Sequence, residues 1–184
     1  VLIGSMNAIT YKEVFNLLKS DKMWLGNGFK SGNAYFSSPI SNEYANGVFD
    51  KETGLVKFRN CCWYTSIDHG KRHQPMALMT YEDNLKFSKH KEIKNNGYIE
   101  YDNYNAIEVS FTDAIPSDYD GVMGVPISFL DKYSPEQFEI VGSDTDVKAG
   151  NLPELVKPNW NGKIDRGYVN GNRIYSRILI RHKK

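Results

Sequence analysis

The first 25 residues predict a strand, a helix and a second strand in close succession. Residues 1–4 (VLIG) and 23–25 (MWL) are short apolar runs, as expected of buried strands. Between them, Thr10 and Glu13 have the spacing of a capping box at the start of a helix. The apolar side chains of that helix share one face: Tyr11, Val14, Phe15 and Leu18. This order is typical of a parallel α/β sheet, in which buried strands need neighbours on both sides. Two strands cannot form such a sheet alone, so we expect further strands to be encoded before Val1.

The rest of the chain is predicted to be richer in strands than in helices. A segment rich in Gly, Asn and Ser leads to a strand over residues 55–67. Residues 81–91 are weakly helical, and a helical turn is predicted at Ser134-Pro135-Glu136. Further strands are predicted over residues 106–111, 122–130 and 138–141. Asn170-Gly171 has the form of a two-residue hairpin turn between strands over residues 164–169 and 173–180.

Four long segments of the chain resemble one enzyme family. They are residues 1–15 (VLIGSMNAITYKEVF), 56–69 (VKFRNCCWYTSIDH), 116–142 (PSDYDGVMGVPISFLDKYSPEQFEIVG) and 173–181 (RIYSRILIR). In this order, they are similar to the C-terminal part of the EcoRI-type adenine-specific DNA methyltransferases. The resemblance implies an enzyme of a restriction–modification system that moves a methyl group from S-adenosylmethionine to the exocyclic amino group of adenine in double-stranded DNA.

The resemblance also implies that the catalytic and cofactor loops lie outside these residues. The family holds its target adenine with an Asn/Asp-Pro-Pro-Tyr/Phe loop, whereas none of the seven prolines here is adjacent to another. The one Gly-x-Gly sequence, Gly26-Asn27-Gly28, is predicted to be a turn that leaves a strand and not a nucleotide loop. We therefore expect a fragment with no catalytic residue and no bound cofactor of its own, with a catalytic part that precedes it. S-Adenosylmethionine is expected only in the complete enzyme.

The expected fold class is α/β: the C-terminal part of a methyltransferase-like mixed sheet, followed by a β-rich target-recognition region. In the family, the catalytic sheet ends with a crossover strand and an antiparallel partner. Residues 1–4, 23–25 and 55–67 would be its last three strands, and residues 27–54 would form the rim of the active-site cleft. The expected domains are therefore residues 1–69, the end of the catalytic sheet, and residues 70–184, the target-recognition and DNA-binding region.

The composition is that of a globular protein with a core, since 40% of the 184 residues are hydrophobic. No apolar run approaches the roughly 20 residues that span a bilayer, so we expect no membrane partner and a cytoplasmic location. Cys61 and Cys62 are neighbours on a predicted strand, where side chains alternate between faces, so we expect them to remain unpaired thiols.

Charges of opposite sign are segregated along the chain although the net charge is only +1. Residues 98–147 carry one basic and eleven acidic side chains, whereas residues 57–94 carry eight and four, and residues 148–184 carry nine and two. This pattern suits a protein that presents basic faces to phosphates and turns an acidic face away. The alternative is that the acidic segment neutralises its basic neighbours within the fold.

Two basic clusters are the candidate contacts to double-stranded DNA. Period-two alternation along the predicted last strand places Arg173, Arg177 and Arg181 on one face, where their planar guanidinium groups could bind phosphate oxygens. The other candidate cluster is Lys71-Arg72-His73, where the catalytic part is expected to give way to the recognition region. For the arginines, salt bridges to the acidic segment are the alternative.

Aromatic side chains near the expected cleft are candidates for holding the target base. Enzymes that modify a base swing it out of the stack and commonly hold it against an aromatic ring. Trp63 and Tyr64 lie late on a predicted strand, and Tyr35 and Phe36 lie in the expected rim. A tryptophan in a strand also belongs commonly to the core, and that alternative stays open for Trp63.

A metal site is not expected. His69 and His73 have the spacing of a metal-binding pair, but Gly70 and Pro75 favour a loop over the helix that such a pair needs. The main functional alternative to the enzyme is a DNA-binding or nuclease-partner module that kept the recognition part and lost the chemistry.

Overall fold

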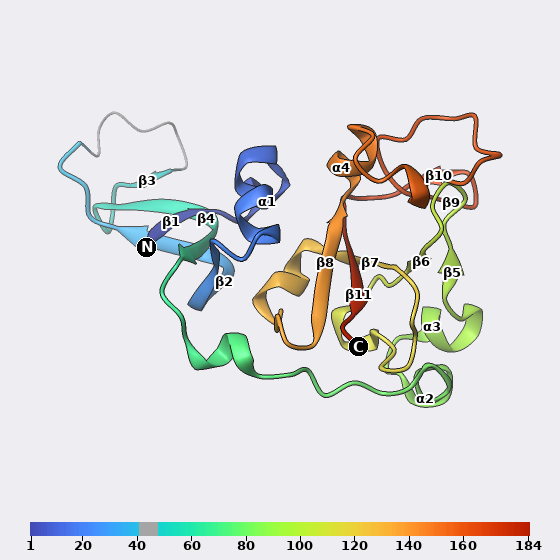
Figure 1. Cartoon of the computed structure of the whole chain (residues 1–184). Helices are drawn as coiled ribbons and strands as arrows, with labels where there is room; N and C mark the ends of the chain where they lie inside the picture. The colour runs from blue at the N-terminus through green and yellow to red at the C-terminus, as the bar shows by residue number, and fades with distance from the viewer. Residues whose placement is uncertain (41–47) are drawn as a thin grey trace. The chain divides into compact units, whose positions relative to one another are not determined.

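A computed structural model describes residues 1–40 and 48–184, which form two compact units, Val1–His69 and Gly70–Lys184 (Figure 1). Both units combine a β-sheet with short helices, so the chain is of the mixed α/β class, as the sequence predicted. The two units are described separately below.

The first unit is a sheet built around one long strand. In chain order it contains β1 (Leu2–Ser5), a 3-10 helix (Met6–Thr10), α1 (Lys12–Lys19), β2 (Trp24–Phe36), β3 (Phe49–Asp50) and β4 (Leu55–Thr65). β4 lies between β1 and β2 and is antiparallel to both, and β3 also pairs with β4 (Figure 1). β1 and β2 therefore run in the same direction, but they are not neighbours. The two strands predicted from the first 25 residues are thus parallel to each other, and β4 takes the position between them.

Helix α1 and the preceding 3-10 helix give the sheet its core. Phe15 and Leu18 of α1 and Met6 and Ile9 of the 3-10 helix are buried, whereas Tyr11 is exposed. The predicted capping box is wrong, because Tyr11 precedes α1 and the Thr10 hydroxyl donates a hydrogen bond back to the Asn7 carbonyl oxygen, at 2.8 Å. β1 is a strand as predicted, but its side chains are mostly exposed. Among the described strands, β1 lies at the edge of the sheet and pairs only with β4.

Strand β2 is much longer than the sequence predicted. Gly26-Asn27-Gly28 lies inside it, so the predicted turn is wrong and the strand continues to Phe36. Gly26 fits because β4 is close: a Cβ there would lie 2.8 Å from the Cβ of Trp63. Part of the predicted rim, residues 27–36, is therefore strand, and residues 41–47 of the rim lie outside the described residues.

The second unit contains a five-stranded sheet in the order β5-β6-β7-β11-β8 (Figure 1). The strands are β5 (Ile99–Glu100), β6 (Ile107–Glu108), β7 (Met123–Pro126), β8 (Phe138–Ser143) and β11 (Arg177–His182). β6 and β7 are parallel, and the other pairs are antiparallel. Three α-helices accompany the sheet, together with short 3-10 helices: α2 (Tyr81–Phe87), α3 (Lys91–Asn96) and α4 (Asp144–Lys148).

The central strand of this sheet is β11. Ile178, Leu179 and Ile180 are all buried, because both faces of β11 are covered and β7 and β8 flank it. Asn170-Gly171 does form the predicted turn, but it joins two short strands, β9 (Tyr168–Val169) and β10 (Asn172–Arg173), which form a separate hairpin.

Candidate functional site

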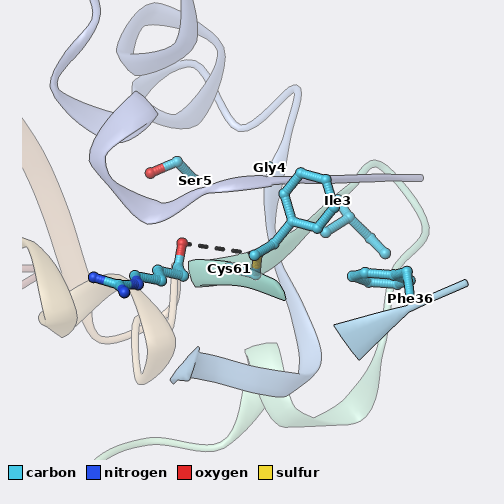
Figure 2. Close-up of a pocket in the computed structure, with 7 residues that line it drawn as sticks. Ile3, Gly4, Ser5, Phe36 and Cys61 are labelled. Carbon is cyan, nitrogen blue, oxygen red and sulfur yellow. Dashed lines mark hydrogen bonds between the residues drawn. The ribbon is translucent and has the colours of Figure 1, made fainter. Parts of the chain in front are cut away.

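An apolar pocket opens on the sheet of the first unit (Figure 2). It has a volume of 410 Å³ and is lined by residues from β1, β2 and β4: Ile3, Gly4, Ser5, Phe36, Phe58, Arg59 and Cys61. Phe36 and Phe58 meet edge to face, with ring centroids 5.6 Å apart. A pocket of this size, with aromatic walls and a few polar groups, is typical of a small-molecule or base-binding site.

An irregularity in β4 helps to shape this pocket. Asn60 has a positive φ of 54°, and the pairing of β2 with β4 shifts register in the same region. Asn60 is held there by a hydrogen bond from its amide nitrogen Nδ2 to Asn7 Oδ1, at 3.0 Å. Phe58 and Cys61 both line the pocket although they are three residues apart, which strict alternation along a strand would not allow. Phe58 and Arg59 were not among the site residues predicted from the sequence, because no Gly or Pro marks the irregularity.

Tyr64 of β4 contacts two β1 residues that line the pocket, Gly4 and Ser5. Its side chain is only 2% exposed, and its hydroxyl donates a hydrogen bond to the Ser5 carbonyl oxygen, at 2.9 Å. Burial raises the pKa of the Tyr64 hydroxyl well above its ordinary value. Gly4 makes room for the ring, since a Cβ there would lie 3.1 Å from it. These contacts tie β1 to β4 and leave no face of the ring open to a base.

The other two aromatic candidates lie in different surroundings. Trp63 is partly buried and lines a second apolar pocket, of 270 Å³, together with Gly26, Ile67 and His69. Tyr35 is half exposed, and the ammonium group of Lys57 lies 5.8 Å from the centre of its ring. The structure therefore brings Phe36 into the larger pocket and places Trp63, Tyr64 and Tyr35 outside the set of residues that line it.

The cluster Lys71-Arg72-His73 forms a 3-10 helix at the start of the second unit. Lys71 Nζ lies 2.6 Å from Asp131 Oδ1, and His73 Nδ1 lies 2.6 Å from Glu136 Oε1. Burial is not the main influence on Glu136: the hydrogen bond from His73 lowers the pKa of its carboxyl to about 2. Two of the three cluster residues are thus paired with carboxylates of the acidic segment.

The three arginines predicted on one strand face occupy different elements and environments. Arg173 lies in β10, whereas Arg177 and Arg181 lie in β11. Arg177 forms a buried ion pair with Glu108, with Nη2 to Oε1 at 2.6 Å and side chains only 12% and 10% exposed. Arg181 pairs with Glu139 at 2.7 Å, where both side chains are about half exposed (47% and 48%). The prediction that the three arginines share one face of a single strand is therefore wrong, because β10 ends at Arg173 and β11 begins at Arg177.

A match to one known family covers nearly the whole chain. The model of the family described as adenine-specific methyltransferase EcoRI matches residues 1–183. The chain belongs to this family.

Three curated methyltransferases show the extent of the similarity. The type II methyltransferase M.EcoRI of Escherichia coli is 37% identical to the chain over 188 aligned residues, which cover all of the chain and 50% of M.EcoRI. The corresponding identities are 30% for M.MgeORF184P of Mycoplasma genitalium and 28% for M.MpnI of Mycoplasma pneumoniae, with 57% and 56% of those proteins covered. The chain therefore spans about half the length of these relatives. No solved structure matches it significantly.

The glycine pair at Gly26-Asn27-Gly28 does not fit a cofactor loop, because it continues β2 and packs against Trp63. Within residues 1–40 and 48–184, no three His, Cys, Asp or Glu side chains come together as metal ligands. Over the same residues, no helix is long and apolar enough to cross a membrane.

Proposed function

We propose that the complete protein is an adenine-specific DNA methyltransferase of a restriction–modification system. In this proposal it transfers a methyl group from S-adenosylmethionine to the exocyclic amino group of adenine in double-stranded DNA. The family match over residues 1–183 carries the proposal. The names of the three relatives, all type II methyltransferases, support it.

In this enzyme Val1–His69 would supply the end of the catalytic sheet. The supporting observation is the strand order β1-β4-β2, in which the last strand along the chain lies between the other two and is antiparallel to both. A crossover strand with an antiparallel partner is the arrangement expected where the catalytic sheet of this family ends. Gly70–Lys184 would be the target-recognition region, and the loops that bind the cofactor and the adenine amino group would lie in the remainder of the protein.

The pocket between β1, β2 and β4 is our candidate for the target-base site. Its volume of 410 Å³ can hold a purine, and Phe36 offers an aromatic ring at its wall (Figure 2). An extruded base loses its stacking on the neighbouring bases of the duplex. Stacking on an aromatic side chain compensates for part of this lost stabilisation. We therefore favour Phe36 as the stacking residue, with Trp63 and Tyr35 as the remaining candidates. For Tyr64 we infer a structural role in joining β1 to β4.

The DNA backbone would be bound by the exposed basic side chains of the second unit. Arg181 is the best placed of the predicted arginines, because its half-exposed pair with Glu139 can exchange for a phosphate, and Lys183 and Lys184 follow it. Lys71, Arg72 and His73 remain a second candidate cluster. Arg177 is held within the fold by Glu108, and we infer that it stabilises the sheet without touching DNA.

Methylation of duplex DNA by the complete protein, followed with a labelled methyl donor, tests the proposal. We expect label on adenine in duplex DNA, and binding of DNA without transfer would favour the non-catalytic module instead. Residues 1–184 alone are expected to show no measurable binding of S-adenosylmethionine by isothermal titration calorimetry. A dissociation constant in the micromolar range for residues 1–184 would place the cofactor site within this chain and contradict the assignment.

A further inference from the structure

The hairpin formed by β9 and β10 presents polar and aromatic side chains to solvent. Arg173 of β10 lies opposite Tyr168 of β9 in the antiparallel pair. The side chain of Arg173 is 52% exposed, and Tyr175, on the chain that leaves the hairpin, is 87% exposed. Asn170, at the tip, is also exposed. Tyr175 and Arg173 thus offer an aromatic ring with a hydroxyl group and a charged donor group to a partner.

The opposite side of the hairpin is anchored in the core. Val169 and Ile174 pack against the buried cluster that contains Tyr101, Tyr104 and Leu179. Gly167 lies directly on the Tyr101 ring, since a Cβ at Gly167 would come within 2.6 Å of it. Because side chains alternate along a strand, Val169 and Ile174 point inward while Tyr168 and Arg173 point outward.

Side chains of the segment between β5 and β6 fix the hairpin as a rigid element. Asp102 accepts hydrogen bonds from the backbone N–H groups of Asn170 and Gly171, at 3.2 and 2.8 Å. The fully buried Asn103 accepts a bond from the Tyr168 N–H and donates one to the Arg166 carbonyl oxygen, at 2.9 and 2.8 Å. Both turn residues have positive φ, 51° and 76°, as a tight two-residue hairpin requires. A fixed backbone suits a recognition element, because little conformational entropy is lost on binding.

The guanidinium group of Arg173 is also oriented. Its Nη2 atom lies 2.7 Å from Asp165 Oδ2, which fixes one edge of the planar group. A guanidinium has five N–H donors, so this contact leaves donor capacity for a second acceptor. The surrounding segment is basic: residues 157–177 contain five Lys or Arg side chains and one acidic side chain, Asp165.

We infer that the outward face of the β9–β10 hairpin, with Arg173, Asn170 and Tyr175, reads base edges in a groove of double-stranded DNA. The inference rests on the proposed function. A two-stranded β-ribbon fits the major groove of B-form DNA, where Arg pairs with the O6 and N7 acceptors of guanine and Asn with the N6 and N7 atoms of adenine. Arg173 is therefore assigned to a guanine in the recognition sequence, and the turn residue Asn170 to a neighbouring base.

The test compares sequence preference and general DNA affinity in the complete protein. Wild type and variants methylate a random-sequence duplex library, and the modified sites are read by sequencing that detects N6-methyladenine. Arg173→Lys keeps the positive charge but not the planar fork, so we expect discrimination at one guanine position to fall about tenfold while affinity for random duplex stays unchanged. Asn170→Gly keeps the positive φ of the turn and removes the amide, and it should relax a different position.

Matched measurements separate this inference from its alternatives. Lys148→Gln removes an exposed cation at the end of α4 and should leave the sequence profile unchanged. Unchanged profiles for Arg173→Lys and Asn170→Gly, in variants that unfold at the wild-type temperature, would overturn the inference. If Arg173→Gln instead weakens specific and random duplex equally with the same profile, Arg173 binds phosphate and the inference is also wrong. Absence of any methylation by the wild-type protein would contradict the proposed function itself.

Discussion

Arg177 and Arg181 lie four residues apart on β11, but the side chain of Arg177 is largely buried and that of Arg181 is about half exposed. Arg177 donates hydrogen bonds to Glu108 from Nε, at 2.9 Å to Oε1 and 3.1 Å to Oε2, and from Nη2, at 2.6 Å to Oε1. The same site contains the buried Tyr101. Burial disfavours the charge of Arg177, but the Glu108 carboxylate outweighs it and raises the pKa of the guanidinium. Arg181 and Glu139 form a similar contact at half exposure, where water screens both charges.

This difference predicts unequal losses of stability. Arg177→Gln leaves the Glu108 charge buried without its partner, and we expect the free energy of unfolding of the second unit to fall by about 3 kcal/mol or more. Arg181→Gln should lower it by less than about 1 kcal/mol. Scanning calorimetry of both variants of the complete protein measures the difference. Equal small losses would show that Glu108 is adequately solvated or paired without Arg177.

The ring of Phe36 is expected to act on the extruded base and not on the DNA backbone. Phe36→Ala should therefore lower turnover more than it lowers DNA affinity, because stacking is gained only after the base leaves the duplex. A fluorescent adenine analogue at the target position reports the extrusion directly. Trp63→Ala and Tyr35→Ala are the comparison variants. A changed signal in Trp63→Ala with none in Phe36→Ala would move the base site to the pocket beside Gly26.

At the scale of elements, β4 and β11 are each the strand around which a sheet is built. β4 supports β1 and β2 on its two edges, and Gly26 of β2 lies close to Trp63 of β4. A glycine inside a strand is often a sign of such a close approach of a neighbouring side chain or backbone. The packing at Gly26 thus explains why a Gly-x-Gly sequence occurs within a strand.

A methyl group at Gly26 should disturb this packing. The Cβ of Gly26→Ala would lie 2.8 Å from the Trp63 Cβ, an atom that cannot move without the β4 backbone, so we expect a loss of about 1–3 kcal/mol in the free energy of unfolding. Gly70→Ala is the matched control, because nothing lies within 4 Å of a Cβ at that position. Thermal unfolding of both variants gives the comparison. A neutral Gly26→Ala would indicate that β2 and β4 can separate locally at low cost.

The strands and turns of the structure were easier to predict from the sequence than the order of the strands in the sheets. The apolar runs predicted β1 and the start of β2, and Asn170-Gly171 predicted the hairpin turn, because each depends on neighbouring residues alone. The position of β4 between β1 and β2 depends on pairing over some 60 residues, and nothing in residues 1–25 encodes it. The candidate pocket was partly predictable: Phe36 was named, whereas Phe58 joins it only through the irregularity at Asn60.

At the scale of the molecule, the segregated charges meet within the second unit. Lys71, His73, Arg177 and Arg181 all pair with carboxylates from residues 98–147. Part of the acidic segment therefore neutralises basic neighbours, which is the alternative that the sequence left open. The pairs differ in exposure, however, and exposure determines whether a phosphate can replace the carboxylate, because an exposed pair is weak and a buried one is costly to break.

This argument predicts which arginine affects the salt dependence of DNA binding. If Arg181 contacts a phosphate, Arg181→Gln should flatten the slope of log affinity against log salt by roughly 0.9, and should weaken specific and random duplex equally. Arg177→Gln should leave the slope unchanged, because Arg177 is paired with Glu108 within the fold and is not expected to contact a phosphate. Glu139→Gln should raise the affinity for DNA, because it removes the carboxylate that competes for Arg181.

Fluorescence anisotropy of a labelled duplex, from low to physiological salt, measures the DNA affinity of all three variants of the complete protein. An unchanged slope for Arg181→Gln would remove β11 from the DNA interface and leave Lys71, Arg72 and His73 as the remaining basic cluster.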